Sequence, residues 1–264
     1  MSRFETLLFE KTPDKVGTIT INRPEAFNSF NVTMCREFQT LWRELAEDDE
    51  VNAVVLRASP GRAFSPGVDV RNPGGEVLGS DNIWNQRDPG EWLGPKQNLF
   101  WKPVIAAVHG LCGGGAFYWL NESDIVICSP DAEFFDPHVT YGMTAALEPI
   151  GLLWRIALPE VLRMALLGND ERIGAETALR ISLVTEIVER EKLWTRAHDL
   201  AATIANKPAI ATQGTVRAIW EALDLGRNAA LHTGLKYCQL GNAIGIPQVD
   251  RNAVMAQKKQ YMIR

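Results

Sequence analysis

Three consecutive glycines, Gly113, Gly114 and Gly115, stand between two segments with different hydrophobic spacing. The segment before them, residues 103–108 (PVIAAV), is a short apolar run of the kind that forms a buried strand. The glycines open an amphipathic segment, and another strand-like run, residues 124–129, follows it. A strand, a glycine turn, a helix and a strand form a crossover unit, so the chain is predicted to adopt an α/β fold.

Strands and helices also alternate in the preceding part of the chain. Residues 4–10 and 16–22 are rich in β-branched or aromatic side chains and are predicted to form two strands joined by the turn TPDK. Asn31 can cap a helix from Val32 to about Glu47, and residues 52–59 are predicted to form a buried strand. After about residue 148 the spacing is mostly helical. The helical segments there are 191–206, 208–225 and 228–243.

Composition and charge argue against several classes of function. The chain has 264 residues, 46% of them hydrophobic, which allows a sizeable core. A net charge of −5 without a basic patch argues against a nucleic-acid partner. The apolar runs are too short to cross a bilayer and the N-terminus lacks a secretory pattern, so we expect a cytoplasmic protein with no membrane partner. The cysteines and histidines lack the spacing of a metal site, so no metal is expected.

Glycine turns between a strand and a helix serve several purposes. Free N–H groups at the start of a helix can bind an anion. The dinucleotide-binding fingerprint fails, because a register from Gly110 meets Cys112 at its third position and a register from Gly113 meets Tyr118 at its sixth. No Gly-Lys-Ser/Thr sequence follows, so a P-loop also fails. A tight packing turn and a site for an anionic oxygen both remain open.

A second turn punctuated by glycine, residues 61–70 (GRAFSPGVDV), follows the predicted strand 52–59. Ligands of α/β folds bind at the ends of strands. Two such turns could aim two backbone N–H groups at one point, and two convergent donors form an oxyanion hole.

Taken together, these segments resemble the enoyl-CoA hydratase/isomerase family, the crotonase superfamily. The resemblance runs in order from about residue 4 to about residue 190. It is carried by INRPEAFNSFN (21–31), GRAFSPGVDV (61–70), KPVIAAVHGLCGGGAF (102–117) and SDIVICSPDAEF (123–134). It implies a spiral of repeated β-β-α units with a helical C-terminal portion, assembled as a homotrimer or a dimer of trimers. Residues 1–195 would form the core that binds acyl-CoA, and 196–264 a helical portion for capping or subunit contacts.

The resemblance also assigns site residues. The oxyanion-hole amides would be those of Val68 and Gly115, which would hold an enolate-like thioester oxygen, and a Cβ at Gly115 would crowd the thioester. Asp69 would brace the loop. Coenzyme A is part of the substrate, and no separate cofactor is expected. The residues implied along the coenzyme A path are Arg23, Arg62, Pro66, Val68, Arg71 and Gly114.

The sequence departs from the family at both acid/base positions. Hydratases of the family place one glutamate four residues into the helix after the glycines and another in a segment like F-G-Q-P-E. Here those places hold Tyr118 and, within FFDPH, His138. His138 is the candidate general base, with Asp136 or Glu148 orienting it or stabilising its charge. Tyr118 either donates a hydrogen bond or forms an apolar wall.

The expected activity is the addition of water to an unsaturated acyl-CoA. One alternative is hydrolytic cleavage of a C–C bond in a β-keto acyl-CoA or a cyclic diketone, with His138 activating the water. Another is a non-catalytic subunit that binds coenzyme A. Residues 72–100 are rich in glycine and proline, as functional loops often are. Trp84 and Trp92 in this segment either line an acyl pocket or pack locally.

Overall fold

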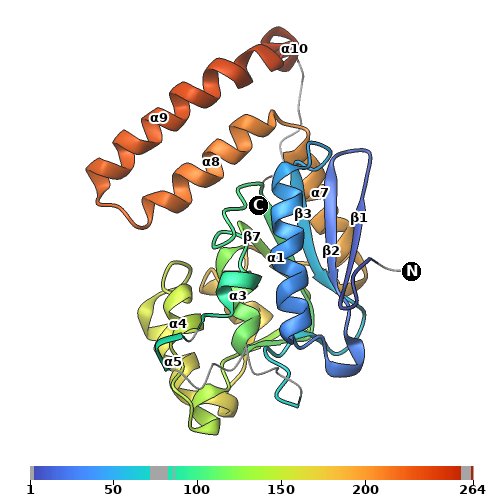
Figure 1. Cartoon of the computed structure of the whole chain (residues 1–264), viewed down its shortest axis with the longest axis vertical. Helices are drawn as coiled ribbons and strands as arrows, with labels where there is room; N and C mark the ends of the chain where they lie inside the picture. Colours follow the sequence, from blue (N-terminus) through green and yellow to red (C-terminus); the bar gives the residue numbers. More distant parts are fainter. Residues whose placement is uncertain (1–2, 72–82, 86, 257–262, 264) are drawn as a thin grey trace. The chain divides into compact units, whose positions relative to one another are not determined.

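The chain folds into two compact units, Met1–Ala205 and Asn206–Arg264, in a computed structural model. The structure describes residues 3–71, 83–85, 87–256 and 263. Figure 1 shows the first unit as strands with helices around them and the second as helices alone.

The first unit contains a sheet of six strands in the order β1-β2-β3-β5-β7-β10. The first two strands are antiparallel, with Leu7 opposite Ile21, and the remaining neighbours are parallel. The strands are β1 (Leu7–Lys11), β2 (Val16–Ile21), β3 (Ala53–Ala58), β5 (Val104–Val108), β7 (Ile125–Cys128) and β10 (Glu186–Ile187). All five strand segments predicted from the sequence are therefore present, with ends that differ by up to three residues.

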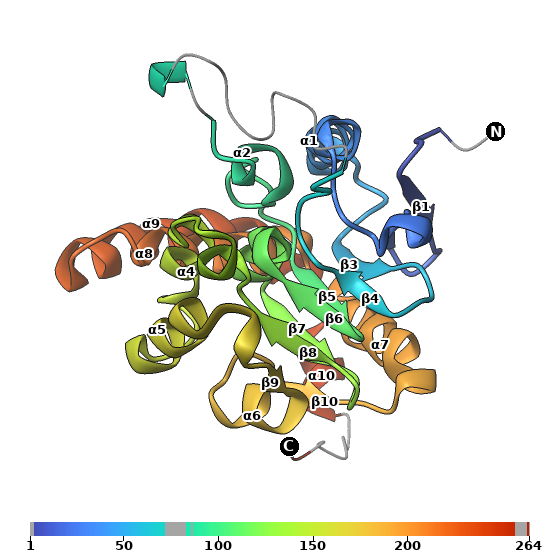
Figure 2. The same cartoon turned by 90° about the horizontal axis from the view of Figure 1, so that it is seen from below.

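A second sheet has the order β4-β6-β8-β9. Its strands are β4 (Ala63–Ser65), β6 (Leu111–Gly113), β8 (Glu133–Phe135) and β9 (Ile173–Gly174). Three of them follow a strand of the larger sheet after a few residues, and Figure 2 shows these pairs together: β3 with β4, β5 with β6, and β7 with β8. A helix follows each pair, which is the repeated β-β-α unit expected from the sequence. The carboxyl ends of β6 and β8 lie side by side because the two strands are parallel.

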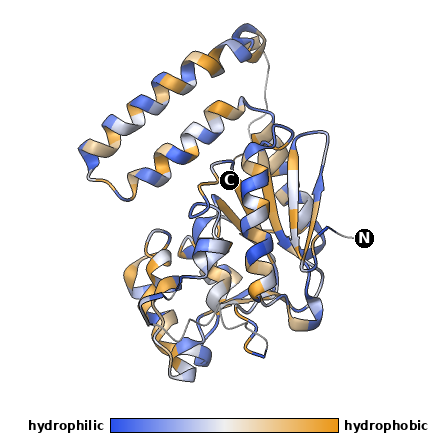
Figure 3. Cartoon of the chain, viewed as in Figure 1, coloured by the Kyte–Doolittle hydropathy of each residue, from blue (hydrophilic) through white to orange (hydrophobic). Residues whose placement is uncertain are grey.

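The larger sheet is covered on both faces. Helix α1 (Val32–Glu47) begins where Asn31 accepts a 3.0 Å hydrogen bond from the Met34 amide, as its predicted cap requires. Alternating residues of a strand point to opposite faces. Val54 and Leu56 of β3 pack in the core cluster that includes the buried stripe of α1, whereas Ala53 and Val55 pack with α7 (Leu193–Ala205). Figure 3 shows hydrophobic and hydrophilic residues alternating along α1.

The first unit also contains shorter helices. They are α2 (Gly90–Leu93), α3 (Phe117–Glu122), α4 (Leu147–Leu152), α5 (Leu158–Leu167) and α6 (Ala175–Arg180). Two 3₁₀ turns matter for the site, Gly114–Ala116 directly before α3 and His138–Tyr141 after β8.

The second unit is helical, as the spacing predicted. Helices α8 (Ala209–Ala222) and α9 (Arg227–Gly245) lie side by side (Figure 1), and α10 (Arg251–Ala256) follows them. The Tyr237 hydroxyl of α9 donates to Glu221 of α8. Among the helices that the structure describes, none combines the length and apolarity needed to span a membrane.

Candidate active site

The glycine triplet lies at the end of β6, where side chains of the same chain approach the backbone closely. A Cβ at Gly113 would lie 2.6 Å from the ring of Phe135 on the neighbouring strand β8. Gly114 has a φ of +51°, a left-handed conformation that favours glycine. A Cβ there would lie 3.3 Å from Cδ of Pro137. Phe135 therefore leaves no room for a side chain at Gly113, and the left-handed backbone at Gly114 favours glycine there.

Gly115 is restricted by an aromatic ring. A Cβ at Gly115 would lie 2.6 Å from Cε1 of Phe30 and 3.4 Å from Cε2 of Tyr118. The sequence interpretation attributed the missing side chain to the thioester. The structure provides a reason within the chain, because Phe30 already fills the space that a Cβ would need.

The Gly115 amide and the loop that carries Val68 come together. Gly67 has a φ of +99°, and a Cβ on it would lie 2.7 Å from the Gly115 nitrogen. Phe30 and Val68 form a parallel β-bridge. Its two hydrogen bonds run from the Phe30 amide to the Gly67 carbonyl, at 2.9 Å, and from the Asp69 amide to the Phe30 carbonyl, at 2.8 Å. The Val68 N–H is thus left out of the bridge, and Gly115 is at the start of a helical segment, where N–H groups lack helical acceptors.

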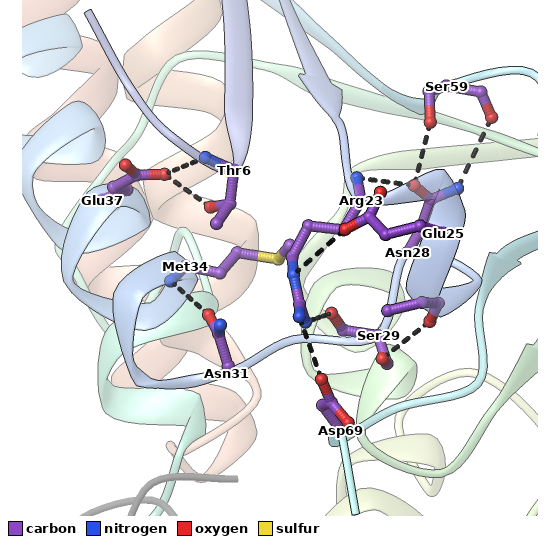
Figure 4. Close-up of polar contacts among 11 residues, drawn as sticks. Thr6, Arg23, Glu25, Asn28, Ser29, Asn31, Met34, Glu37, Ser59 and Asp69 are labelled. Carbon is purple, nitrogen blue, oxygen red and sulfur yellow. Dashed lines mark hydrogen bonds and ion pairs between the residues drawn. The ribbon is translucent and has the colours of Figure 1, made fainter. Parts of the chain in front are cut away.

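Arg23 braces the Val68 loop (Figure 4). Its Nη2 lies 2.9 Å from Oδ2 of Asp69, and its Nη1 donates to the Ser29 carbonyl at 2.8 Å. The Arg23 and Asp69 side chains are only 14% and 10% exposed. The structure therefore places Arg23 in an internal ion pair, whereas Arg62 and Arg71 are exposed to solvent.

The segment after β8 brings three titratable side chains together. Asp136 is fully buried, and its Oδ1 accepts from the His138 amide at 3.0 Å and lies 2.6 Å from Nδ1 of the imidazole. The other ring nitrogen, Nε2, lies 3.7 Å from Oε1 of Glu148 in the first turn of α4. The imidazole is thus held between two carboxyl groups, as a base oriented by a third group requires.

The same three side chains have the spacing of metal ligands, with ligand atoms within 4.8 Å of one another. The geometry does not favour a metal. Nδ1 of His138 is occupied by Asp136, and a cation between Nε2 and Glu148 would leave Asp136 on the far side of the ring. His138 is hydrogen-bonded to Asp136 and lies within ion-pair distance of Glu148.

The surroundings of His138 and Glu148 raise the pKa of both side chains. The hydrogen bond to Asp136 raises the pKa of His138, burial opposes this, and the nearby Glu148 charge adds to it. Burial raises the pKa of Glu148, and the positive charge on His138 opposes that shift. Both groups therefore hold protons to higher pH than usual.

Tyr118 lies near both Gly115 and Glu148. Its ring meets Phe30 edge-on at a centroid distance of 6.5 Å, and the residue is 8% exposed. Burial and the charges of Glu148 and Asp88 strongly raise the pKa of its phenol, which stays protonated. Asp88 is a site neighbour that the sequence interpretation missed, because no spacing relates it to Tyr118.

The two tryptophans of residues 72–100 have different surroundings. Trp92 is buried in the main core and Trp84 is 87% exposed. Residues 72–82 and 86 of the predicted functional loop lie outside the described part of the chain. An apolar cleft of about 560 Å³ lies between α4 and α5, and its lining includes Val139 and Pro149, which directly follow His138 and Glu148.

Comparison with known proteins places these features in a family. The profile of the enoyl-CoA hydratase/isomerase family matches residues 11–237. An (E)-benzylidenesuccinyl-CoA hydratase from Thauera aromatica is 32% identical over 227 residues, 85% of each chain. A short-chain-enoyl-CoA hydratase from Clostridium acetobutylicum is 31% identical over 82% of each chain. The crystal structure of an enoyl-CoA hydratase/isomerase from Mycobacterium paratuberculosis superposes with a TM-score of 0.86 at 31% identity, covering 99% of this chain and 100% of that one. The chain belongs to the enoyl-CoA hydratase/isomerase family, the crotonase superfamily.

Proposed function

We propose that this protein adds water to the double bond of a 2-enoyl-CoA thioester. The observation that carries the proposal is the His138–Glu148 pair, with a nitrogen–oxygen separation of 3.7 Å, next to the oxyanion-hole turn. Tyr118 lies next to both the turn and the pair. Its ring is close to Gly115, and the charge of Glu148 raises the pKa of its phenol. The pair takes over the work of the two glutamates that other hydratases of the family use.

The backbone amides of Val68 and Gly115 bind the thioester oxygen. When water adds to Cβ, negative charge moves to this oxygen, and the two N–H groups stabilise the resulting enolate. Losing one such donor typically costs about 3–4 kcal/mol of transition-state stabilisation. The close packing of Gly67 on Gly115 keeps the two donors in fixed positions.

His138 and Glu148 carry the protons. Nε2 of His138 accepts a proton from the attacking water, and Asp136 holds the imidazole through Nδ1. Glu148, whose pKa is raised by burial, delivers a proton to Cα. Proton transfer from His138 to Glu148 across the 3.7 Å gap then restores the starting state. Tyr118 remains a neutral phenol throughout.

The substrate is held at two ends. Arg62 and Arg71, exposed next to the Val68 loop, attract the phosphates of coenzyme A, and Pro66 and Gly114 border the pantetheine path. The apolar cleft next to His138 and Glu148 favours an acyl group without charge. The family resemblance and the exposure of the two arginines support these contacts.

The test follows hydration and proton exchange in heavy water. A panel of linear, branched and aromatic 2-enoyl-CoAs is incubated with the protein, and the 3-hydroxyacyl product and its deuterium at Cα are measured by mass spectrometry. We expect turnover that drops by about 10²- to 10⁴-fold in His138→Ala and in Glu148→Gln. Full turnover in either variant would remove that residue from the mechanism, and no turnover of any tightly bound enoyl-CoA would contradict the proposal.

A second candidate is hydrolysis of a C–C bond in a β-keto acyl-CoA or a cyclic diketone. The 2.6 Å contact between Asp136 and His138 favours it, because a histidine oriented by a buried carboxylate is suited to activating water for attack on a carbonyl. Water would attack the ketone, and the amides of Val68 and Gly115 would hold the departing enolate. Cleavage of a β-keto thioester or diketone without hydration of any enoyl-CoA would decide for this candidate.

A further inference from the structure

Asn121 reaches from α3 to the segment that carries Glu148. Its Nδ2 donates a 2.9 Å hydrogen bond to the main-chain oxygen of Glu148. Asn121 is 8% exposed, and Gly151 of α4 lies directly against its amide, where a Cβ would overlap Nδ2. Glycine at position 151 therefore lets α4 approach α3 closely enough for the hydrogen bond to form.

Arg155 holds the same two helices together at the end of α3. Its Nε donates to the Asn121 carbonyl at 3.2 Å, and its Nη2 donates to the Ser123 carbonyl. These carbonyls are among the last of α3 and have no acceptor role within the helix. Burial lowers the pKa of Arg155 to about 10, opposed by Asp124 and Glu122, so the group stays cationic at neutral pH.

Asn121 is an unusual choice for this place on packing grounds alone. Its Oδ1 is buried and has no hydrogen-bond partner among the described residues. An apolar residue would avoid leaving a buried acceptor unsatisfied. The Nδ2 donor, directed at the Glu148 carbonyl, is the interaction that an apolar residue could not supply.

We propose that Asn121 is a positioning residue that holds Glu148 against His138. The inference rests on the proposed function, in which Glu148 delivers a proton. The helical segment that starts at the Gly115 turn ends beyond Asn121, so one rigid piece of chain sets the position of the enolate oxygen and of the acid that protonates it. Without the hydrogen bond, the first turn of α4 moves and the 3.7 Å separation between His138 and Glu148 lengthens.

The first test needs no substrate. The imidazole of His138 is titrated by NMR in the wild type and in Asn121→Leu, which keeps the bulk and removes the donor. The charge of Glu148 raises the pKa of His138, so moving Glu148 away lowers it. The other titratable groups that face the pair are Asp136, Tyr118 and Asp88. Asn121→Ala repeats the measurement if leucine is poorly accommodated.

The second test is a double-mutant cycle on turnover. We expect Asn121→Leu to lower kcat by about 10- to 100-fold with KM within about twofold, because a small displacement of a reacting group costs this much. In the Glu148→Gln background the same change should have no further effect. Asn52→Ala is the matched control, since it breaks a 3.1 Å amide-to-carbonyl bond to Ala205 far from the site.

The outcomes separate the inference from the function it rests on. An unchanged pKa of His138 together with additive losses in the cycle would overturn the positioning role. A lowered pKa of His138 in Asn121→Leu supports the positioning role, whatever the turnover of Glu148→Gln. Full turnover in Glu148→Gln would count against proton delivery by Glu148, and not against the positioning role.

Discussion

Gly115 and Phe30 leave no room for a side chain between them, since a Cβ at Gly115 would lie 2.6 Å from Cε1 of the phenyl ring. The backbone of Phe30 also forms the bridge to Val68, so one residue contacts both sides of the predicted oxyanion hole, through its ring on one side and its main chain on the other. The requirement for glycine is thus a packing requirement, and we expect it to maintain the geometry of the predicted oxyanion hole.

Replacing Gly115 by alanine tests this relationship. We expect Gly115→Ala to lower the free energy of unfolding by about 1–3 kcal/mol, because overpacking displaces the Phe30 ring. Phe30→Leu alone should also destabilise, by leaving a void. The double variant should regain stability and turnover, which urea unfolding and a hydration assay would show. A double variant that is stable but inactive would mean that the Cβ obstructs the thioester itself.

Asp136→Asn should change both the titration and the chemistry of His138. The hydrogen bond to Asp136 is the largest cause of the raised pKa of His138, so its loss should lower that pKa. Because His138 must be deprotonated to act as the base, the acidic limb of the pH–rate profile should move to lower pH. We expect kcat to fall by about 10²-fold or more. Asp131→Asn, at a carboxylate that accepts from Ser129, is the control. An unchanged NMR titration of His138 would show that Asp136 has only a structural role.

Much of the fold could be predicted from the sequence because local signals and tertiary packing agree. Helix α1 has a cap at Asn31 and a regular apolar stripe, so its bounds match the prediction. The strands of the second sheet were not predicted, because each has three residues or fewer and is specified by pairing with distant strands. No local pattern reports such pairing.

The candidate site also has features that could be predicted from the sequence and features that could not. The turn at Gly113–Gly115 could be found in the sequence, and so could His138, at a position where the family resemblance predicts a glutamate. The sequence could suggest that Glu148 lies near His138. It could not predict that Nε2 of His138 faces Glu148, because the loop between them cannot be aligned with the family at a definite residue. Arg23 was predicted to contact coenzyme A, and its ion pair with Asp69, 46 positions later in the chain, was not predicted.

Two arginines near the Val68 loop should therefore have separable roles. Arg23→Met removes the partner of Asp69 and loosens the loop, so we expect kcat to fall by about 10- to 100-fold with little change in KM. Arg62→Met removes an exposed charge, so we expect KM for acyl-CoA to rise by up to about fivefold with kcat unchanged. Inhibition by free coenzyme A measures the affinity directly. A large loss of coenzyme A affinity in Arg23→Met would contradict this division.

His109 should make the fold sensitive to acid. It is 2% exposed at the end of β5, and burial, aided by the charge of Arg190, lowers the pKa of His109 to about 4. The unfolded chain takes up this proton near pH 6.5, whereas the folded chain does not until about pH 4. Stability is therefore lost as the pH falls from about 6.5 and the loss levels off below the folded pKa. The depressed pKa corresponds to roughly 3 kcal/mol at the acid end.

His109→Asn should remove this part of the acid sensitivity. Urea unfolding of the wild type and the variant between pH 7.5 and pH 4 would measure the difference in their free energies of unfolding, which should shift in favour of the variant as the pH falls. His232→Asn, at an exposed position of α9, controls for the loss of a histidine as such. Parallel stability curves for the wild type and His109→Asn would show that His109 accepts a proton in the folded state as readily as in the unfolded chain, which would mean that its ring is accessible to water.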